Sequence, residues 1–106
     1  MGLFNLLKQS DINQGVAKYR SMPGAVLLDV RTPREYREGH IPGSINLPLQ
    51  ALDNAAEIVE NEDTPIYVYC YSGSRSRQAA AILGAMGYVN ITNIGGIAAY
   101  SGKVEA

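Results

Sequence analysis

The segment at the centre of this chain reads Tyr67-Val68-Tyr69-Cys70-Tyr71-Ser72-Gly73-Ser74-Arg75-Ser76. The run from Ile66 to Tyr69 is apolar, aromatic and β-branched and follows a proline, which predicts a short buried strand. Beyond Ser76, apolar residues recur at helical spacing and predict a helix that ends at Gly87; they are Ala79, Ile82, Leu83 and Met86. The only cysteine of the chain therefore lies where a buried strand turns into a helix.

This position favours ionisation of the Cys70 thiol. The first N–H groups of a helix have no partner within the helix, and together with the helix dipole they attract an anion. Successive N–H groups in the tight loop from Ser72 to Ser76 can form an anion-binding nest. A free thiol is only roughly 3% ionised at pH 7, and a pKa near 7 or below makes at least half of it nucleophilic. We therefore interpret Cys70 as a thiolate nucleophile, and Arg75 in the first helical turn is tolerated best beside an anion.

A second long motif lies closer to the N-terminus, at residues 28–46. It reads Leu28-Asp29-Val30-Arg31-Thr32-Pro33-Arg34-Glu35-Tyr36-Arg37-Glu38-Gly39-His40-Ile41-Pro42-Gly43-Ser44-Ile45-Asn46. This segment resembles one signature of the rhodanese (thiosulfate sulfurtransferase) family, and Cys-x-x-Gly-x-Arg-Ser at residues 70–76 resembles the active-site loop of that family. Two long motifs in the expected order, with their connecting segments, cover most of the chain.

The resemblance implies roles for the residues around the thiol. Cys70 is expected to be the catalytic nucleophile, and the loop residues are expected to bind the substrate: Tyr71, Ser72, Gly73, Ser74, Arg75 and Ser76. Tyr71 could instead pack on a neighbouring loop. Three further residues near the site are expected to be structural: Asp29 and Arg31 as an ion pair that fixes loops, and His40, because this chemistry needs no general base. Members of the family commonly have a tryptophan after the Gly-Gly pair, and here Tyr100 is the aromatic that could take its place.

Composition narrows the classes of function. The chain has 106 residues, 46% hydrophobic content and a net charge of −1, which fits one domain, residues 1–106, and argues against a nucleic-acid partner. One Cys excludes an internal disulfide, and with one His it leaves no metal site within a single chain. We expect no cofactor.

The N-terminal sequence lacks the marks of a targeting segment. No basic region precedes the short apolar run at residues 3–7, and Leu6 departs from the myristoylation pattern. No apolar run is long enough to span a bilayer. We therefore expect a cytoplasmic protein without a membrane partner.

The order of predicted elements defines the fold class. A short edge strand at residues 3–7 precedes a helix capped by Ser10 or Asp11. A strand at 25–30, a proline-started helix after Thr32, a brief strand at 44–47 and a helix at 49–60 come before the cysteine strand. A last strand at 89–94, a Gly95-Gly96 turn and a helical turn at 97–100 follow the cysteine helix. This alternation predicts an α/β fold of the three-layer rhodanese type, with a mostly parallel sheet of four to five strands between helices.

The resulting hypothesis is a sulfurtransferase that moves a sulfane sulfur from thiosulfate or a similar small donor to a thiophilic acceptor through a Cys70 persulfide. A thiol or a dithiol protein is a possible acceptor. One alternative is a persulfide carrier or docking module that delivers sulfur to a partner protein. A phosphatase or arsenate reductase is disfavoured, because related phosphatases use Cys-x5-Arg and this chain has Cys-x4-Arg between Cys70 and Arg75.

Overall fold

A computed structural model describes residues 11–106 and contains one sheet between helices. The strands are β1 (Val26–Asp29), β2 (Ile45–Asn46), β3 (Ile66–Cys70) and β4 (Ile91–Gly96), in the spatial order β2-β1-β3-β4. All three strand pairings are parallel, which confirms the predicted fold class. The edge strand predicted at residues 3–7 lies outside the described residues.

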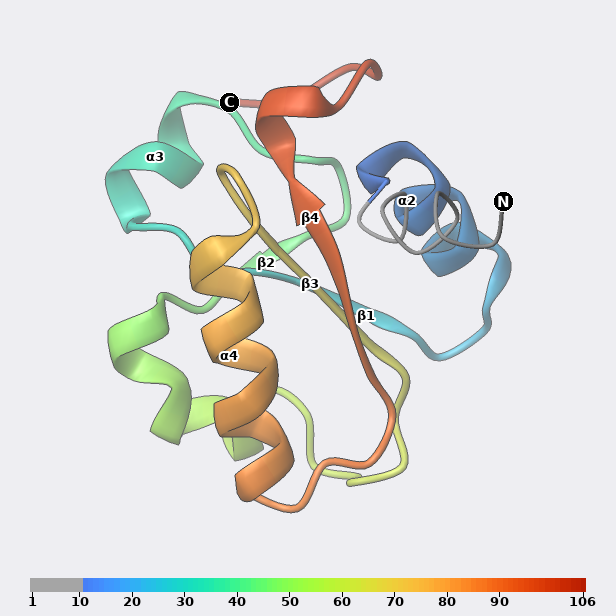
Figure 1. Cartoon of the computed structure of the whole chain (residues 1–106), viewed down its shortest axis with the longest axis vertical. Coiled ribbons are helices and arrows are strands. Elements are labelled where there is room, and N and C mark those ends of the chain that lie inside the picture. The colour runs from blue at the N-terminus through green and yellow to red at the C-terminus, as the bar shows by residue number, and fades with distance from the viewer. Residues whose placement is uncertain (1–10) are drawn as a thin grey trace, which may run out of the picture.

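Helices cover both faces of the sheet (Figure 1). The helix α2 (Ile12–Ser21) packs on one face, and α4 (Ser74–Ala85) with the 3-10 segment η1 (Leu49–Glu57) packs on the other. The short α3 (Pro33–Glu38) and the 3-10 turn η2 (Ile97–Ala99) follow the carboxyl ends of β1 and β4. In the described part of the chain, no helix has the length and apolarity needed to cross a membrane.

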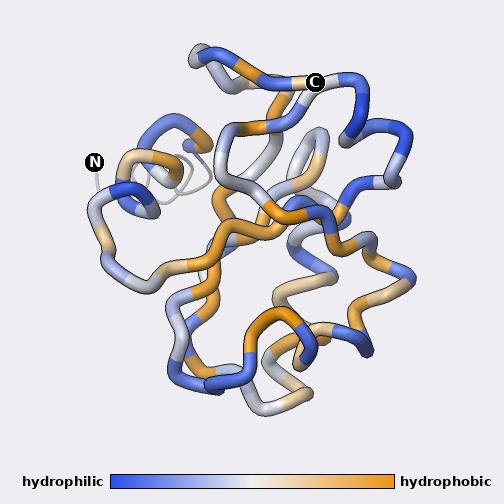
Figure 2. The backbone as a smooth tube through the Cα atoms, turned by 180° about the vertical axis from the view of Figure 1, so that it is seen from behind, coloured by the Kyte–Doolittle hydropathy of each residue, from blue (hydrophilic) through white to orange (hydrophobic). Residues whose placement is uncertain are grey.

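Alternation along the central strand divides the core into two clusters. Ile66, Val68 and Cys70 join the cluster beneath α4 and η1, whereas Tyr67 and Tyr69 join the cluster beneath α2. All five residues of β3 are buried because both faces of a parallel sheet are covered. Figure 2 shows the apolar residues concentrated along the central strands, with hydrophilic loops around them.

Local signals set several element boundaries as predicted. Asp11 caps α2 by accepting from the backbone N–H of Asn13 at 3.0 Å. Thr32 and Glu35 form the capping box of α3, with Pro33 in the first turn and Gly39 at the C-cap. These bounds follow from side-chain bonds to free backbone groups at the helix ends.

The helix after Cys70 begins at Ser74, so that Arg75 lies in its first turn as expected, and Gly73 is its N-cap in a left-handed conformation with φ 105°. Two predictions about the helices were wrong. Ile82 is 41% exposed, because α4 instead turns Ser76, Ala79 and Leu83 toward the sheet. The segment at 49–60 is a 3-10 segment that is kinked at Ala51, and it ends at Glu57.

The Gly95-Gly96 pair is also not a free turn. These residues end β4, where Gly95 pairs with Tyr69 and Gly96 pairs with Cys70 after a register shift. A side chain at Gly96 would collide with the backbone carbonyl of Tyr71. The glycine therefore serves the close approach of β4 to the cysteine loop.

Candidate active site

Cys70 is the last residue of β3, at the carboxyl edge of the parallel sheet. Its side chain is 1% exposed and points to the α4 side, as the alternation of the strand dictates. Sites in sheets of this kind lie beyond the carboxyl ends of the strands. The strand thus places the sulfur where the loop before α4 can enclose it.

The loop wraps hydrogen-bond donors around this sulfur. The backbone N–H of Gly73 donates to Cys70 Sγ at 2.9 Å, and Ser76 Oγ lies 3.4 Å from the same sulfur. Ser76 is itself fully buried at the first turn of α4. Gly73, at φ 105°, is the N-cap and reverses the chain so that its N–H faces the cysteine.

These contacts determine the ionisation of the thiol. Burial raises the pKa of Cys70, but hydrogen bonds from the Ser76 hydroxyl and from the backbone of Ser76, Gly73 and Ser72 together outweigh it, so that the pKa lies below the ordinary value. Hydrogen bonds to the charged form favour that form. The arrangement of donors around the sulfur can therefore stabilise a thiolate.

Arg75 has an anionic partner that the sequence did not reveal. Its Nη1 and Nη2 donate to the two carboxylate oxygens of Glu35 on α3 at 2.7 and 3.0 Å. This pair lowers the pKa of Glu35 to about 2, with further help from Thr32. The anion beside Arg75 in the described structure is thus the Glu35 carboxylate.

The other predicted loop residues line two cavities. Ser72, Gly73 and Ser74 border a cavity of about 670 Å³ that also contacts Arg77 and Asn93. Tyr71 is 54% exposed and borders a second cavity of about 290 Å³. The remaining lining residues of that second cavity are Arg31, Glu35, Glu38, Gly39, Ile97 and Val104.

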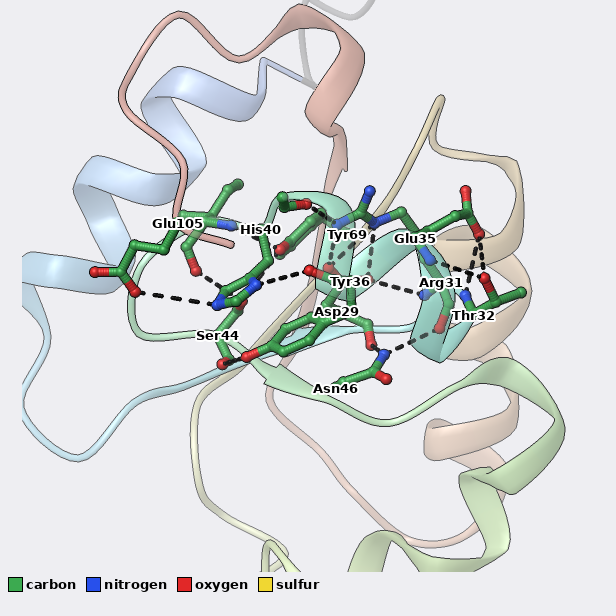
Figure 3. Close-up of polar contacts among 12 residues, drawn as sticks. Asp29, Arg31, Thr32, Glu35, Tyr36, His40, Ser44, Asn46, Tyr69 and Glu105 are labelled. Atoms are coloured by element: carbon green, nitrogen blue, oxygen red, sulfur yellow. Dashed lines mark hydrogen bonds and ion pairs between the residues drawn. The ribbon is translucent and has the colours of Figure 1, made fainter.

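Asp29 and Arg31 form the buried ion pair that we expected. Arg31 Nη2 lies 2.7 Å from Asp29 Oδ2 and also donates to the carbonyl oxygen of Gly39 at 2.7 Å. The amide of Asn46 donates to the backbone carbonyls of both residues at 3.0 Å (Figure 3). Arg31 therefore ties the loop after β1 to the end of α3, and Asn46 ties the same loop to β2.

His40 makes structural contacts in the described residues. Its Nδ1 lies 2.8 Å from the carbonyl oxygen of Tyr36, and its ring stacks on the Tyr36 ring with a centroid distance of 3.7 Å (Figure 3). Its backbone exchanges hydrogen bonds with Glu105. These contacts hold the C-terminal segment against the end of α3.

Tyr100 lies on the other side of the sheet from the thiol. It packs against the cluster beneath α2, whereas Cys70 belongs to the cluster beneath α4. Among residues 11–106, no group of three His, Cys, Asp or Glu side chains gathers as metal ligands.

Sequence reasoning missed two residues that contact the site. Glu35 was visible only as the last residue of a capping box, and its second role with Arg75 depends on the tertiary structure. Asn93 Oδ1 accepts a hydrogen bond from the Ser76 hydroxyl at 2.7 Å. No sequence motif includes Asn93.

The chain belongs to the rhodanese-like family. The sequence profile of the rhodanese-like domain matches residues 13–103. Thiosulfate sulfurtransferase PspE of Escherichia coli is 39% identical over 71 residues, which cover 66% of this chain and 68% of that relative. The putative sulfur carrier protein YrkF of Bacillus subtilis is 38% identical over 80 residues, which cover 74% of this chain but only 43% of that relative.

Solved structures have the same fold. A rhodanese with anions from E. coli is 34% identical with a TM-score of 0.72, and the match covers 76% of this chain and 96% of that one. The crystal structure of the Alr3790 protein from Anabaena is 31% identical with a TM-score of 0.78, and it covers 92% of this chain and 91% of that one.

Proposed function

We propose that this protein is a sulfurtransferase that works through a persulfide on Cys70. The thiolate attacks the outer sulfur of thiosulfate, the bond between the two donor sulfurs breaks, and sulfite leaves with the bonding electrons. Cys70 then carries the transferred sulfur with its negative charge on the terminal atom. A thiophilic acceptor such as cyanide removes that atom and restores the thiolate, so that two half-reactions share one residue.

The observation that carries this proposal is the set of donors at the sulfur. The Gly73 N–H lies 2.9 Å from Cys70 Sγ, and the loop's hydrogen bonds lower the pKa of the thiol despite its burial. Attack of a thiolate on a sulfane sulfur transfers no proton and so needs no general base. A loop that stabilises the thiolate by hydrogen bonds alone is suited to this step.

The relatives support the choice of donor. PspE of E. coli and GlpE of Pseudomonas entomophila are both described as thiosulfate sulfurtransferases, and each is 39% identical over the matched segment. We assign the sulfonate end of thiosulfate to Arg75, which is the cation in the loop. Because Glu35 already binds two of its N–H groups, a dianionic donor must share or displace that carboxylate.

Intact mass spectrometry tests the mechanism directly. Thiosulfate should add one sulfur to the protein, and cyanide should remove it as thiocyanate. The Cys70→Ser variant should keep the fold, as checked by circular dichroism, and should gain no mass. Substantial sulfur transfer by that variant would overturn the proposal.

A carrier role is the second candidate. It draws support from YrkF, described as a putative sulfur carrier protein, and from the 33% identical adenylyltransferase and sulfurtransferase uba4 of Ogataea parapolymorpha. Both roles need the same loop, and they differ in the acceptor. Capture of mixed disulfides of Cys70 from cells separates them, because only a carrier should yield one recurrent protein partner with a reactive thiol.

Phosphoryl transfer is the class that we disfavour. The Cys-x4-Arg spacing gives a loop that is too short to enclose a tetrahedral phosphoryl group beside the sulfur. Hydrolysis of a simple aryl phosphate should therefore be negligible. Steady turnover that Cys70→Ser abolishes would favour a phosphatase instead.

The wider assignment follows from the same chemistry. We propose that residues 1–106 act as one domain in the cytoplasm, where a single thiol stays reduced. The proposed reaction uses only the side chain of Cys70 and the loop around it.

A further inference from the structure

The Ser76 hydroxyl lies between two acceptors on neighbouring strands. Its Oγ is 3.4 Å from Cys70 Sγ on β3 and 2.7 Å from Asn93 Oδ1 on β4. The carbonyl oxygens of Gly73 and Gly95 lie farther away than the Asn93 oxygen, at 3.1 and 3.4 Å. A hydroxyl carries one proton, and Ser76 is fully buried, so these acceptors compete for that proton.

Asn93 can lose this hydrogen bond and still have partners for its amide group. Its Oδ1 also accepts the backbone N–H of Gly95 at 3.0 Å, and its Nδ2 donates to the carbonyl of Gly73 at 3.4 Å. When the Ser76 proton turns away, the amide oxygen therefore keeps one donor and is not left unsatisfied. Loss of a single bond from such a group costs little compared with burying an unpaired polar atom.

The charge on the sulfur decides where the proton points. Beside a neutral thiol, a weak acceptor, the short contact to Asn93 is the stronger bond. Beside a thiolate, the bond to sulfur becomes charge-assisted and about twice as strong as a neutral one. The geometry allows both states by rotation of the hydroxyl alone.

We propose that Asn93 is a positioning residue that acts on Cys70 through Ser76, because its amide oxygen holds the Ser76 proton whenever the sulfur is uncharged. This inference rests on the proposed sulfur transfer. In the persulfide, the negative charge lies on the outer sulfur, so the proton returns to Asn93. When an acceptor attacks the outer sulfur, the S–S bond breaks, its electrons return to Cys70 and Ser76 turns back to the sulfur.

The ionisation of Cys70 tests this competition without any sulfur donor. Asn93→Leu removes the acceptor at similar volume and should increase the thiolate-to-thiol ratio about three- to tenfold at a given pH, measured by thiolate absorbance or iodoacetamide alkylation against pH. In a Ser76→Ala background, the same substitution should leave the ratio unchanged. The charged groups near the thiol remain the same throughout: Arg75 on α4, Glu35 on α3, and the pair of Asp29, which ends β1, and Arg31, which follows it.

An equal effect of Asn93→Leu in both backgrounds, or no effect in either, would overturn the proposal. A second measurement avoids any dependence on the stability of the Asn93 variant. In the unsubstituted protein, the side-chain carbonyl ¹³C shift of Asn93 should titrate with Cys70, and in Ser76→Ala it should not. A constant shift through the ionisation of Cys70 would contradict the rotation. Failure of sulfur loading by thiosulfate would instead refute the proposed function and leave these titrations interpretable.

Discussion

Arg75 on α4 donates to both carboxylate oxygens of Glu35 on α3, at 2.7 and 3.0 Å. This paired geometry joins the cysteine loop to the helix that follows β1. It also neutralises the loop's cation before any donor arrives. The charge of the donor should therefore determine how strongly each residue of the pair affects the rate.

We expect opposite effects on donor preference from the two members of this pair. Arg75→Ala should lower kcat/KM for thiosulfate about tenfold, which is the low end for a charge-assisted hydrogen bond worth about 1.5 to 3 kcal/mol. Glu35→Gln should raise it about three- to tenfold, because the guanidinium then keeps its charge for the sulfonate. Steady-state kinetics with thiosulfate and with a neutral sulfane donor measure both.

The neutral donor and a second variant are the controls. Both effects should nearly vanish with the neutral donor. Glu38→Gln removes an exposed carboxylate from the same helix, where it pairs with Arg34, and should change kcat/KM for neither donor. Equal losses with charged and neutral donors would mean that Arg75 only shapes the loop.

The Arg75–Glu35 pair should make the free energy of unfolding depend on pH. The pKa of Glu35 falls from 4.5 to about 2 on folding, chiefly through its bonds from Arg75. A carboxyl group whose pKa is lower in the folded state stabilises the fold at pH values above its unfolded pKa. This stabilisation is lost as the pH falls from about 4.5 toward 2. Since about a third of each side chain is exposed and solvent screens the pair, we expect Glu35→Gln to cost about 1 kcal/mol at pH 7 and much less at pH 2.

Urea unfolding of the two proteins at several pH values measures this difference. The Glu38→Gln variant again supplies the reference for removal of a charge. A difference between the original protein and Glu35→Gln that stays constant from pH 5 to pH 2 would contradict the depressed pKa.

Cys70 should react as a thiolate below the range of a free thiol. Hydrogen bonds from Ser76 and the loop backbone outweigh burial and lower its pKa. Alkylation by iodoacetamide should therefore remain fast well below pH 8, and Ser76→Ala should move the midpoint upward by removing one donor. A midpoint at the free-thiol value in the original protein would refute the role of the loop.

Removal of one partner from the buried pair of Asp29 and Arg31 should destabilise the fold. Both side chains are nearly inaccessible, so Arg31→Met leaves an uncompensated buried carboxylate at a cost of about 3 to 5 kcal/mol. Arg34→Met breaks an exposed pair on the neighbouring helix and should cost less than about 1 kcal/mol. Chemical denaturation compares the two variants, and equal costs would argue against a structural role for the buried pair.

Substitution of Gly96 should displace the cysteine loop. A side chain there would collide with the backbone at Tyr71 and Ser72, so Gly96→Ala should abolish sulfur loading. Gly84→Ala is the matched control, since that position is exposed in α4 and an added methyl group would meet Ile91 at the ordinary contact distance of 4.0 Å. The control should stabilise the protein by about 0.5 to 1 kcal/mol and keep full loading. Normal loading by Gly96→Ala would show that the loop tolerates the shift.

Features encoded by neighbouring residues were predictable from the sequence. The strand at Ile66, the cap at Asp11 and the capping box at Thr32 depend on local periodicity and on side chains that bond nearby backbone. The position of Cys70 between strand and helix follows from the same local patterns. The buried face of α4 was not predictable from these patterns. Ile82 fits the apolar spacing but is exposed, whereas the polar Ser76 is buried.

The sequence by itself determined the order of the elements, the parallel sheet and the position of Cys70 between strand and helix, because hydrophobic periodicity and helix-start chemistry act over a few residues. Only the tertiary structure decided which groups surround Cys70 and its loop. Glu35 reaches Arg75 across 40 positions, and Asn93 reaches Ser76 across 17. Such partners meet because parallel strands bring their carboxyl ends to one edge of the sheet, and no local pattern specifies which side chains then come within hydrogen-bond distance.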